Sequence, residues 1–330
     1  MSKVRIVFLG TPEFAVTSLA RLASDEHFEI VAVISQPDRP AGRKMQLKAS
    51  PVKDLALRLN LPVLTPQTVN TEEFRAQIAA LRPQSAAVVA FGQILGQKFL
   101  DLFPLGAVNV HGSLLPRWRG AAPIQRAVMA GDLETGVALQ IIVRKLDAGP
   151  LLGVRKMPIP ESLDATSLHD ALKDLGADLL HVEYMDYLRG NLSPVIQDES
   201  LVTVAPKIEK AEAKIDWTQS AREIFNRIRG LTMGPSAYSI LAAGRESEGG
   251  SEIAADCATL NLKIHLSRVI LDAGQHGLPG EVLPSTPGTL QVACGQGVLE
   301  VLEIQPESRS RQKVVEFLRG YRLQSSARFL

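Results

Sequence analysis

The first 190 residues alternate short apolar runs with stretches of helical periodicity. Most of the apolar runs lack period-two alternation, which is typical of strands that are covered on both faces. Strands separated by helices form βαβ units, whose strands lie parallel. We therefore expect residues 1–190 to form an α/β domain around a mostly parallel sheet. Its strands are predicted at Val4–Leu9, Ile30–Ile34, Pro62–Leu64, Ala86–Ala90, Val108–His111, Gly136–Val143 and Leu151–Pro158.

Two dipeptides in this half have the composition of helix starts. Thr11-Pro12 and Ser50-Pro51 each combine an N-cap residue with a proline at the first helical position. A longer helix is predicted from Thr166 to about Leu188, with Gly190 as its end. This helix is expected to close the first domain.

The segment Asn191–Pro206 contains two prolines and no strong helical period, so it is predicted to be a linker. A helix is expected after it at Thr218–Gly230. Short strands broken by Gly and Pro follow, at Ala237–Ala242, Leu260–Leu271, Gly280–Leu283, Thr289–Val292 and Val298–Leu302. This pattern favours a small barrel or sandwich as a second domain over residues 207–330.

The composition agrees with a globular protein of two domains, since 45% of the 330 residues are hydrophobic and 22% are charged. The formal net charge is only +1, so the total charge does not favour a nucleic acid or an anionic membrane as partner. The two cysteines, Cys257 and Cys294, are too few for a disulfide framework, which fits a reducing cytoplasm. No apolar run has the length of a signal peptide or a membrane span, so we expect a cytoplasmic protein.

The first strand is followed by Gly10-Thr11-Pro12-Glu13-Phe14, which lacks the second and third glycines of a GxGxxG fingerprint. Pro12 and Glu13 stand where the backbone would approach a pyrophosphate, which argues against dinucleotide binding. The predicted domain is therefore a Rossmann-like sheet without a nicotinamide site. The turn also fits an ordinary corner between strand and helix.

Asn109 and His111 lie two residues apart at the end of a predicted strand, so their side chains share one face. Open α/β sheets bind ligands at the carboxyl ends of their strands. An amide donor beside an imidazole is suited to stabilising an oxyanion and moving a proton. The same pair also fits a hydrogen-bonded Asn and His that simply end a strand.

Asp147 follows the predicted strand Gly136–Val143 after a short loop. If that strand neighbours the strand of His111, the Asp147 carboxylate lies near the imidazole across adjacent loops, and it orients the ring and stabilises its charge. An Asp two residues before Gly149 is also common in turns that have no further role.

Three motifs together resemble the 10-formyltetrahydrofolate-dependent formyltransferases. They are Asn109-x-His111, the following Gly112–Gly120 (Gly-Ser-Leu-Leu-Pro-Arg-Trp-Arg-Gly), and Leu146-Asp147-x-Gly149. The likeness extends along nearly the whole chain and is weaker in the second domain. The segments Gly10–Ala15, Gln36–Arg43 and Gly120–Arg126 resemble the members that act on methionyl initiator tRNA.

The resemblance implies roles for residues at matching positions. Asn109, His111 and Asp147 match the catalytic residues. The positions that match the folate site are Phe91, Gly92, Ile94 and Leu95 in the segment that lines the pterin pocket, and Ser113, Leu114, Leu115 and Pro116. Phe91 stands where Tyr is more frequent, and Ala148 replaces the usual Thr.

The implied reaction transfers the formyl group from N10 of 10-formyltetrahydrofolate, the co-substrate, to the α-amino group of methionine on initiator tRNA. We hypothesise that Asn109 and His111 stabilise the oxyanion, while Asp147 holds His111 and accepts the proton of the amine, directly or through water. No metal is expected, because the six histidines show no HxH or HExxH spacing.

Separating the charge by position changes the expectation about nucleic acid. Residues 38–58 carry six Lys or Arg against two Asp, and residues 309–328 carry six Arg or Lys against one Glu. Such clusters can neutralise phosphates, although they are also typical of a solvated surface. The resemblance implies that the loop Pro37–Ser50 contacts the tRNA acceptor end, with Arg39, Arg43 and Lys44 as binding residues. It also implies an OB-like barrel for the second domain, residues 207–330, with a role in tRNA binding.

Two of the family's features are missing. Arg229–Pro235 lacks the Asn-Pro-Trp-Pro often found there, and Lys44 follows Arg43 where Gly is common.

Other functions remain open at this point. The nearest alternative is another folate-dependent formyltransferase, acting on a sugar nucleotide or on glycinamide ribonucleotide with the same Asn-His-Asp chemistry. The basic loop and the second domain argue against the glycinamide enzyme. A tRNA- or folate-binding protein without activity is a further alternative, against which the three catalytic-type residues argue. We expect a monomer.

Overall fold

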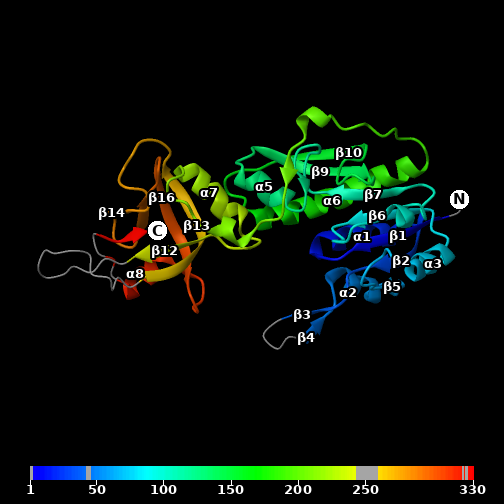
Figure 1. Ribbon diagram of the computed structural model, residues 1–330, viewed down its shortest axis with the longest axis horizontal. Coiled ribbons are helices and arrows are strands. Elements are labelled where there is room, and N and C mark those ends of the chain that lie inside the picture. The colour runs from blue at the N-terminus through cyan, green and yellow to red at the C-terminus, as the bar shows by residue number, and fades with distance from the viewer. Residues whose placement is uncertain (1–2, 42–45, 243–258, 322, 324–325) are drawn as a thin grey trace, which may run out of the picture. The chain divides into compact units, whose positions relative to one another are not determined.

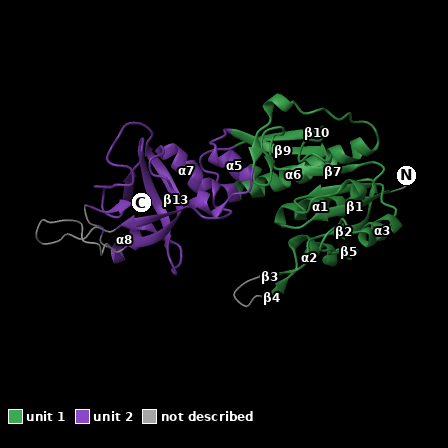
Figure 2. Cartoon of the chain, in the orientation of Figure 1, with its two compact units in different colours: residues 1–123, 134–158, 167–205 green, residues 124–133, 159–166, 206–330 purple. Residues whose placement is uncertain are grey.

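The computed structural model describes residues 3–41, 46–242, 259–321, 323 and 326–330 (Figure 1). The chain forms two compact units (Figure 2). Unit 1 comprises residues 1–123, 134–158 and 167–205, and unit 2 comprises residues 124–133, 159–166 and 206–330. Two segments that the sequence pattern assigned to the first domain, 124–133 and 159–166, thus belong to unit 2. Of the segment 191–206, expected as a linker, residues 191–205 belong to unit 1 and Pro206 to unit 2.

Unit 1 is built on a seven-stranded sheet with the order β10-β9-β7-β6-β1-β2-β5. The five strands β5, β2, β1, β6 and β7 run parallel, and β9 is antiparallel to both of its neighbours. The predicted mostly parallel sheet is therefore confirmed. The strands are β1 (Val4–Gly10), β2 (Phe28–Ile34), β5 (Val63–Leu64), β6 (Ser85–Val89), β7 (Ala107–His111), β9 (Glu134–Ile141) and β10 (Leu151–Pro158).

Helices cover both faces of this sheet, which explains the uninterrupted apolar strands. On one face, Phe74 of α3 (Glu72–Ala80) and Phe99 of α4 (Gln97–Leu100) pack with strand residues in a buried cluster. On the other face, Tyr184 of α6 (Ala165–Leu188) is fully buried, stacks on Phe28 and donates a 2.7 Å hydrogen bond to Ser85 Oγ. The remaining helices of unit 1 are α1 (Val16–Ser24) and α2 (Pro51–Arg58).

The two predicted helix starts have different outcomes. Ser50 caps α2, where its hydroxyl accepts from Lys53 N at 3.1 Å and Pro51 opens the helix, as expected. The prediction for Thr11 is wrong. Pro12 precedes a 3-10 turn, η1 (Glu13–Ala15), and Thr11 Oγ1 donates instead to the carbonyl of Phe91 at 2.9 Å. A tertiary hydrogen bond thus takes the hydroxyl that the local pattern assigned to a cap.

Two small pairings lie outside the main sheet of unit 1. The hairpin of β3 (Arg39–Ala41) and β4 (Gln46–Lys48) extends from the loop after β2. The two-residue strand β11 (Val204–Ala205) pairs in parallel with β8 (Arg119–Gly120). Between α6 and β11 the chain also forms the 3-10 turn η2 (Glu199–Leu201). Residues 191–205 are therefore packed structure.

Unit 2 contains an antiparallel sheet that nearly closes into a barrel. Its strand order is β14-β15-β16-β13-β12-β18, with β17 paired to β16. A bridge between Glu281 and Arg328, and a 2.8 Å bond from Phe329 N to Gly280 O, bring the two ends of this order together. The elements are α5 (Pro123–Met129), η3 (Lys210–Ala213), α7 (Ala221–Gly230), β12 (Tyr238–Ala242), β13 (Thr259–Leu271), β14 (Val282–Leu283), β15 (Leu290–Ala293), β16 (Val298–Pro306), β17 (Gln312–Lys313), α8 (Val314–Gly320) and β18 (Arg328–Phe329). The predicted OB-like barrel agrees with this near-barrel.

Among the described residues, no helix has the length and apolar character that a membrane crossing requires.

The burial of β9 gives a stability prediction. Leu139 is fully buried at the centre of β9, so Leu139→Ala should lower the free energy of unfolding by about 3 kcal/mol through lost burial and a residual cavity. Leu133→Ala is the control, because Leu133 is 85% exposed, and it should change this free energy by less than about 0.5 kcal/mol. Urea denaturation of both variants measures the difference. Equal midpoints would contradict the packing described for β9.

Candidate active site

Strand β7 places Asn109 and His111 on one face of the sheet. Val110 points to the opposite face, where a Cβ on Gly176 of α6 would come within 2.8 Å of its side chain. Gln140 of β9 is paired directly with Asn109, so its side chain lies on the same face as Asn109 and His111. The site therefore lies on the sheet face away from α6.

The His111 ring is held through one of its two nitrogens. The side chain is only 6% exposed, and Nε2 lies 2.8 Å from the backbone oxygen of Trp118. Because a carbonyl oxygen can only accept, Nε2 carries a hydrogen and donates it. The other nitrogen, Nδ1, lies 3.7 Å from Oδ2 of Asp147, which is beyond hydrogen-bond distance but close enough for an ion pair with a protonated ring. The exchangeable position of the ring thus faces the carboxylate.

The Asp147 carboxylate is fixed by two donors. Its Oδ2 accepts from the backbone N–H of Gly120 at 2.9 Å, and its Oδ1 accepts from Gln140 Nε2 at 3.0 Å. The Asp147 backbone has a φ of 48°, in the left-handed region that non-glycine residues seldom adopt. The surrounding contacts must therefore hold both the backbone and the carboxylate in place.

The chain brings Asp147 to His111 by a route that differs from the expected one. The sequence pattern placed both residues beyond neighbouring strand ends, but β9 runs antiparallel to β7, so its carboxyl end lies beside the start of β7. The loop 142–150 then folds back over Gln140. Gly149 makes this return possible, since a Cβ there would lie 1.6 Å from the Ile141 oxygen.

Asn109 is half-buried beside this pair. Within the part of the chain that the structure describes, its amide makes no side-chain hydrogen bond, so its N–H groups are available to a ligand. The arrangement combines an unpartnered amide, an imidazole with one exchangeable nitrogen, and a largely buried carboxylate. Such a set can bind a developing oxyanion and move a proton.

The first group of predicted folate residues divides between core and surface. The Phe91 ring is buried in the core, and its carbonyl accepts from both Thr11 and Gln36. Gly92 is exposed, Leu95 is half-buried against the core, and Ile94 is 86% exposed. Ile94 therefore presents free apolar surface.

The second group follows β7. Ser113 is fully buried, and its hydroxyl donates to the backbone oxygen of Arg117 at 2.6 Å. Leu115 is buried as well, whereas Leu114 and Pro116 are half-buried. In this structure Ser113 stabilises the turn, and Leu114 and Pro116 have the accessible surface.

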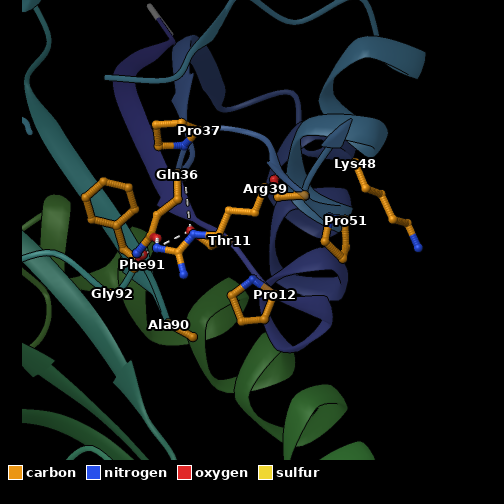
Figure 3. Close-up of a pocket in the computed structure, with 11 residues that line it drawn as sticks. Thr11, Pro12, Gln36, Pro37, Arg39, Lys48, Pro51, Ala90, Phe91 and Gly92 are labelled. Carbon is orange, nitrogen blue, oxygen red and sulfur yellow. Dashed lines mark hydrogen bonds between the residues drawn. The ribbon is translucent and has the colours of Figure 1, made fainter. Parts of the chain in front are cut away.

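A pocket of about 350 Å³ lies at the carboxyl ends of β1, β2 and β6 (Figure 3). In the sheet, β2 and β5 lie on one side of β1, and β6 and β7 lie on the other. The strand order therefore reverses at β1, and open α/β sheets bind ligands at such a topological switch point. The lining residues are Thr11, Pro12, Gln36, Pro37, Arg39, Lys48, Ser50, Pro51, Ala90, Phe91 and Gly92.

The predicted tRNA residues are only partly covered by the structure. Arg39 lines the pocket, and its guanidinium donates to Gln36 Oε1 and extends towards Thr11 (Figure 3). Arg43 and Lys44 lie outside the described residues. Asp38 pairs with Lys53 at 2.8 Å, so two of the charges counted around this loop neutralise each other.

Among the described residues, no group of three or more His, Cys, Asp or Glu side chains is arranged to hold a metal ion.

Sequence reasoning missed three groups that complete the site: Gln140, the carbonyl of Trp118 and the N–H of Gly120. Gln140 is 2% exposed within the apolar strand β9, and a polar residue inside such a run was the available signal. The two backbone groups carried no signal of their own, because any residue supplies a carbonyl and an N–H.

Two family models match the chain. The family described as formyl transferase matches residues 4–182, and the one described as formyl transferase, C-terminal domain, matches residues 207–322. Relatives match over almost the full length. A methionyl-tRNA formyltransferase of Bdellovibrio bacteriovorus is 53% identical over 326 residues, which cover 98% of this chain and 98% of the relative. One of Bradyrhizobium diazoefficiens is 42% identical over 327 residues, covering 99% of both.

Solved structures with a similar fold include a sugar formyltransferase and a protein bound to tetrahydrofolic acid. A sugar 3N-formyl transferase, solved in the presence of dTDP and 5-N-formyl-THF, has a TM-score of 0.63 at 18% identity and covers 94% of this chain and 100% of its own. HypX from Aquifex aeolicus, in complex with tetrahydrofolic acid, has a TM-score of 0.57 at 16% identity and covers 96% of this chain and 47% of its own. At these identities the likeness concerns the fold.

The hydrogen bond to Trp118 makes a prediction about His111. Because Nε2 donates to a carbonyl, the neutral ring should carry its hydrogen on Nε2 and not on Nδ1. A ¹⁵N NMR spectrum of the ring in the folded protein checks this tautomer. We expect Nε2 to have the shift of a protonated nitrogen and Nδ1 the shift of an unprotonated one. A neutral ring with its hydrogen on Nδ1 would contradict the geometry.

Proposed function

The chain belongs to the formyl transferase family, and from this we propose that it transfers the formyl group of 10-formyltetrahydrofolate to the α-amino group of methionine on initiator tRNA. The observation that carries the proposal is the 53% identity to a methionyl-tRNA formyltransferase over 98% of both chains. The family models match both parts of the chain, residues 4–182 and 207–322. Because charged tRNA is consumed in translation, we place the activity in the cytoplasm, with the chain acting as a monomer.

In this reaction the amine nitrogen attacks the formyl carbon, and negative charge develops on the formyl oxygen. The C–N10 bond then breaks, and N10 of the folate gains a proton. The half-buried Asn109 amide, free of other partners among the described residues, would donate to the formyl oxygen as its charge develops. Removing one donor to a developing oxyanion typically costs about 3 kcal/mol of transition-state stabilisation.

His111 has the geometry to carry the proton. The attacking amine must lose a proton and the leaving nitrogen must gain one, so a single group that accepts and then donates serves both needs. Nδ1 is the nitrogen free for this exchange, since Nε2 is bound to Trp118. The Asp147 carboxylate is held by Gly120 and Gln140 with Oδ2 3.7 Å from Nδ1, so we assign Asp147 to stabilising the imidazolium.

The folate would lie against the apolar surface next to His111. Ile94 and Leu146 are both highly exposed, and Leu146 directly precedes Asp147. Leu114 and Pro116 add half-buried surface from the loop after β7. These side chains would pack on the pterin and its linker, and the neighbouring backbone groups would supply hydrogen bonds. Two structural neighbours are named with folate derivatives, which supports this class of co-substrate.

The acceptor end of the tRNA would enter the pocket at the switch point. Arg39 brings a guanidinium to the pocket rim beside Thr11 and Gln36, and Lys48 on the paired strand adds a second cation. These groups suit a backbone phosphate near the terminal nucleotide. In the sequence, Arg43 and Lys44 stand between Arg39 and Lys48 and add two basic residues.

A formylation assay with purified protein tests the function. With 10-formyltetrahydrofolate, methionyl initiator tRNA should be formylated much faster than methionyl elongator tRNA. An amino sugar nucleotide serves as the competing acceptor, because enzymes of similar fold act on sugars. Transfer to the sugar nucleotide without transfer to tRNA would overturn the proposal.

Replacing either member of the His–Asp pair tests the catalytic assignment. His111→Ala and Asp147→Ala should each lower kcat by about 10³-fold, because general acid–base groups contribute roughly 10²–10⁴-fold. The controls are His276→Ala and Asp170→Ala, which change exposed side chains and should leave kcat unchanged. Circular dichroism should show folded protein in all four. Near-normal turnover of a folded His111 or Asp147 variant would refute its role.

Arg39 makes a prediction about affinity. Arg39→Ala should raise KM for methionyl-tRNA about tenfold with little change in kcat, and should make the slope of log affinity against log salt shallower by about 1. Lys98→Ala is the control, since Lys98 is an exposed cation on α4. Kinetics and binding between 50 and 200 mM salt, about the range over which phosphate contacts weaken strongly, measure both effects. An unchanged salt slope would remove Arg39 from the tRNA contact.

A further inference from the structure

Residues 195–205 run along the loop 116–122 of the active site. We call residues 195–205 the strap. Its backbone pairs with the loop, where Arg119 N donates to Thr203 O at 2.9 Å and Ala122 N donates to Ala205 O at 3.1 Å. Thr203 Oγ1 also accepts from Trp118 N at 2.9 Å. The strap thus supports the two backbone groups of this loop that contact His111 and Asp147.

One side chain of the strap contacts both active-site loops. Gln197 is 5% exposed, and its Nε2 donates to the backbone oxygens of Asp147 at 2.9 Å and Gly149 at 2.7 Å. Its Oε1 accepts from Nε and a terminal nitrogen of Arg119 at 3.1 and 2.8 Å. A single amide therefore joins the backbone of the Asp147 loop to the residue next to Gly120.

A second strap residue makes a weaker, more exposed link between the same loops. Glu199 accepts from Arg119 at 2.8 Å and from Lys145 at 2.6 Å, and these hydrogen bonds lower its pKa to about 2. Its side chain is mostly exposed, so the ion pairs are screened by water and contribute little on their own. Gln197 is the buried link.

The bonds from Gln197 act at the point where the site is most constrained. Asp147 has a φ of 48°, and relaxation of this backbone would turn the carboxylate away from Gly120 and from His111. The two carbonyls on either side of Ala148 are those that Gln197 holds. Two donors from one rigid, buried amide therefore fix the direction of the Asp147 side chain.

We propose that Gln197 is a positioning residue for formyl transfer, which holds the Asp147 loop so that the carboxylate faces His111 Nδ1. The inference rests on the proposed function, because it assigns Gln197 to the same site. It differs from a purely structural role in what it predicts. Loss of the amide should slow the chemical step while substrate affinity is retained, since Gln197 bonds the backbone oxygens of Asp147 and Gly149 and no side chain proposed to contact folate or tRNA.

The first test replaces Gln197 by a side chain of similar length without hydrogen bonds. Gln197→Met should lower kcat by about 10- to 100-fold, the range expected when a catalytic group moves by about 1 Å, with each KM changing less than about threefold. Ile196→Met is the matched control on the neighbouring residue, which is 85% exposed, and it should keep normal kinetics. An unchanged kcat, or a loss that appears only in KM, would overturn the proposal.

A second variant separates the two halves of the amide. Gln197→Glu keeps an acceptor for Arg119 but cannot donate to the carbonyls of Asp147 and Gly149. If the donated bonds position Asp147, this variant should be as slow as Gln197→Met although its pairing with Arg119 persists. Normal turnover of Gln197→Glu would show that Arg119, and not the Asp147 loop, is what Gln197 holds.

A third measurement does not depend on activity. The Gly120 N–H donates to Asp147 Oδ2, so its hydrogen exchange reports whether the carboxylate is in place. In Gln197→Met this amide should exchange at least about tenfold faster, whereas in Ile196→Met it should match the parent protein. Unchanged protection of Gly120 in Gln197→Met would overturn the inference. If the parent protein formylates no tRNA but Gly120 loses protection as predicted, the proposed function fails while the positioning of Asp147 by Gln197 stands.

Discussion

Burial of a carboxylate is costly unless donors surround it, and this requirement organises the active site of the chain. Asp147 meets it with the N–H of Gly120 and the amide of Gln140, which belong to different segments. The loop that carries Gly120 also supplies the Trp118 carbonyl that holds His111. Once Asp147 is satisfied, the two loops are joined and Nδ1 of His111 faces the carboxylate. The catalytic geometry is thus a consequence of satisfying one buried charge.

The sequence predicted the parts of this arrangement that depend on local patterns. Apolar runs located the strands of unit 1, and the two-residue spacing placed Asn109 and His111 on one face of β7. The direction of a strand could not be predicted from the pattern, because an apolar run such as that of β9 looks the same whether the strand is parallel or antiparallel to its neighbour. The expected path to Asp147 was therefore wrong, although the structure does bring Asp147 near His111.

Residues that act over long sequence distances were also hidden. Gln197 contacts the oxygen of Asp147, 50 positions earlier, and lies in a segment whose two prolines indicated a linker. Thr11 was expected to cap a helix, but its hydroxyl bonds to the Phe91 carbonyl, 80 positions later. In both cases the local sequence showed a polar residue that needs a hydrogen-bond partner, but it did not show which partner. Tertiary packing determines the partner, and it brings together residues that are far apart in the sequence.

The near-zero net charge of +1 is compatible with a nucleic-acid substrate, and the ion pairs in the structure show which basic side chains already have acidic partners. Lys53 forms an ion pair with Asp38, and Arg311 donates to Glu303 at 2.6 Å. Glu199 forms ion pairs with both Arg119 and Lys145. Counting charges by segment therefore overstates the cations available to phosphates. Arg39 lines the pocket, and for its proposed contact with tRNA its position matters more than the total charge of the chain. This fits recognition by a few placed groups rather than by a broad basic surface.

The central claim is that His111 and Asp147 work as one unit, and a double-mutant cycle on kcat tests it most directly. The two single alanine variants and the double variant are compared in the same assay with methionyl initiator tRNA. If the carboxylate acts through the imidazole, the double variant should be no slower than the slower single variant, within about threefold. If the loss of kcat in the double variant instead equals the product of the two single losses, His111 and Asp147 act independently. That result would contradict a catalytic role for their 3.7 Å contact.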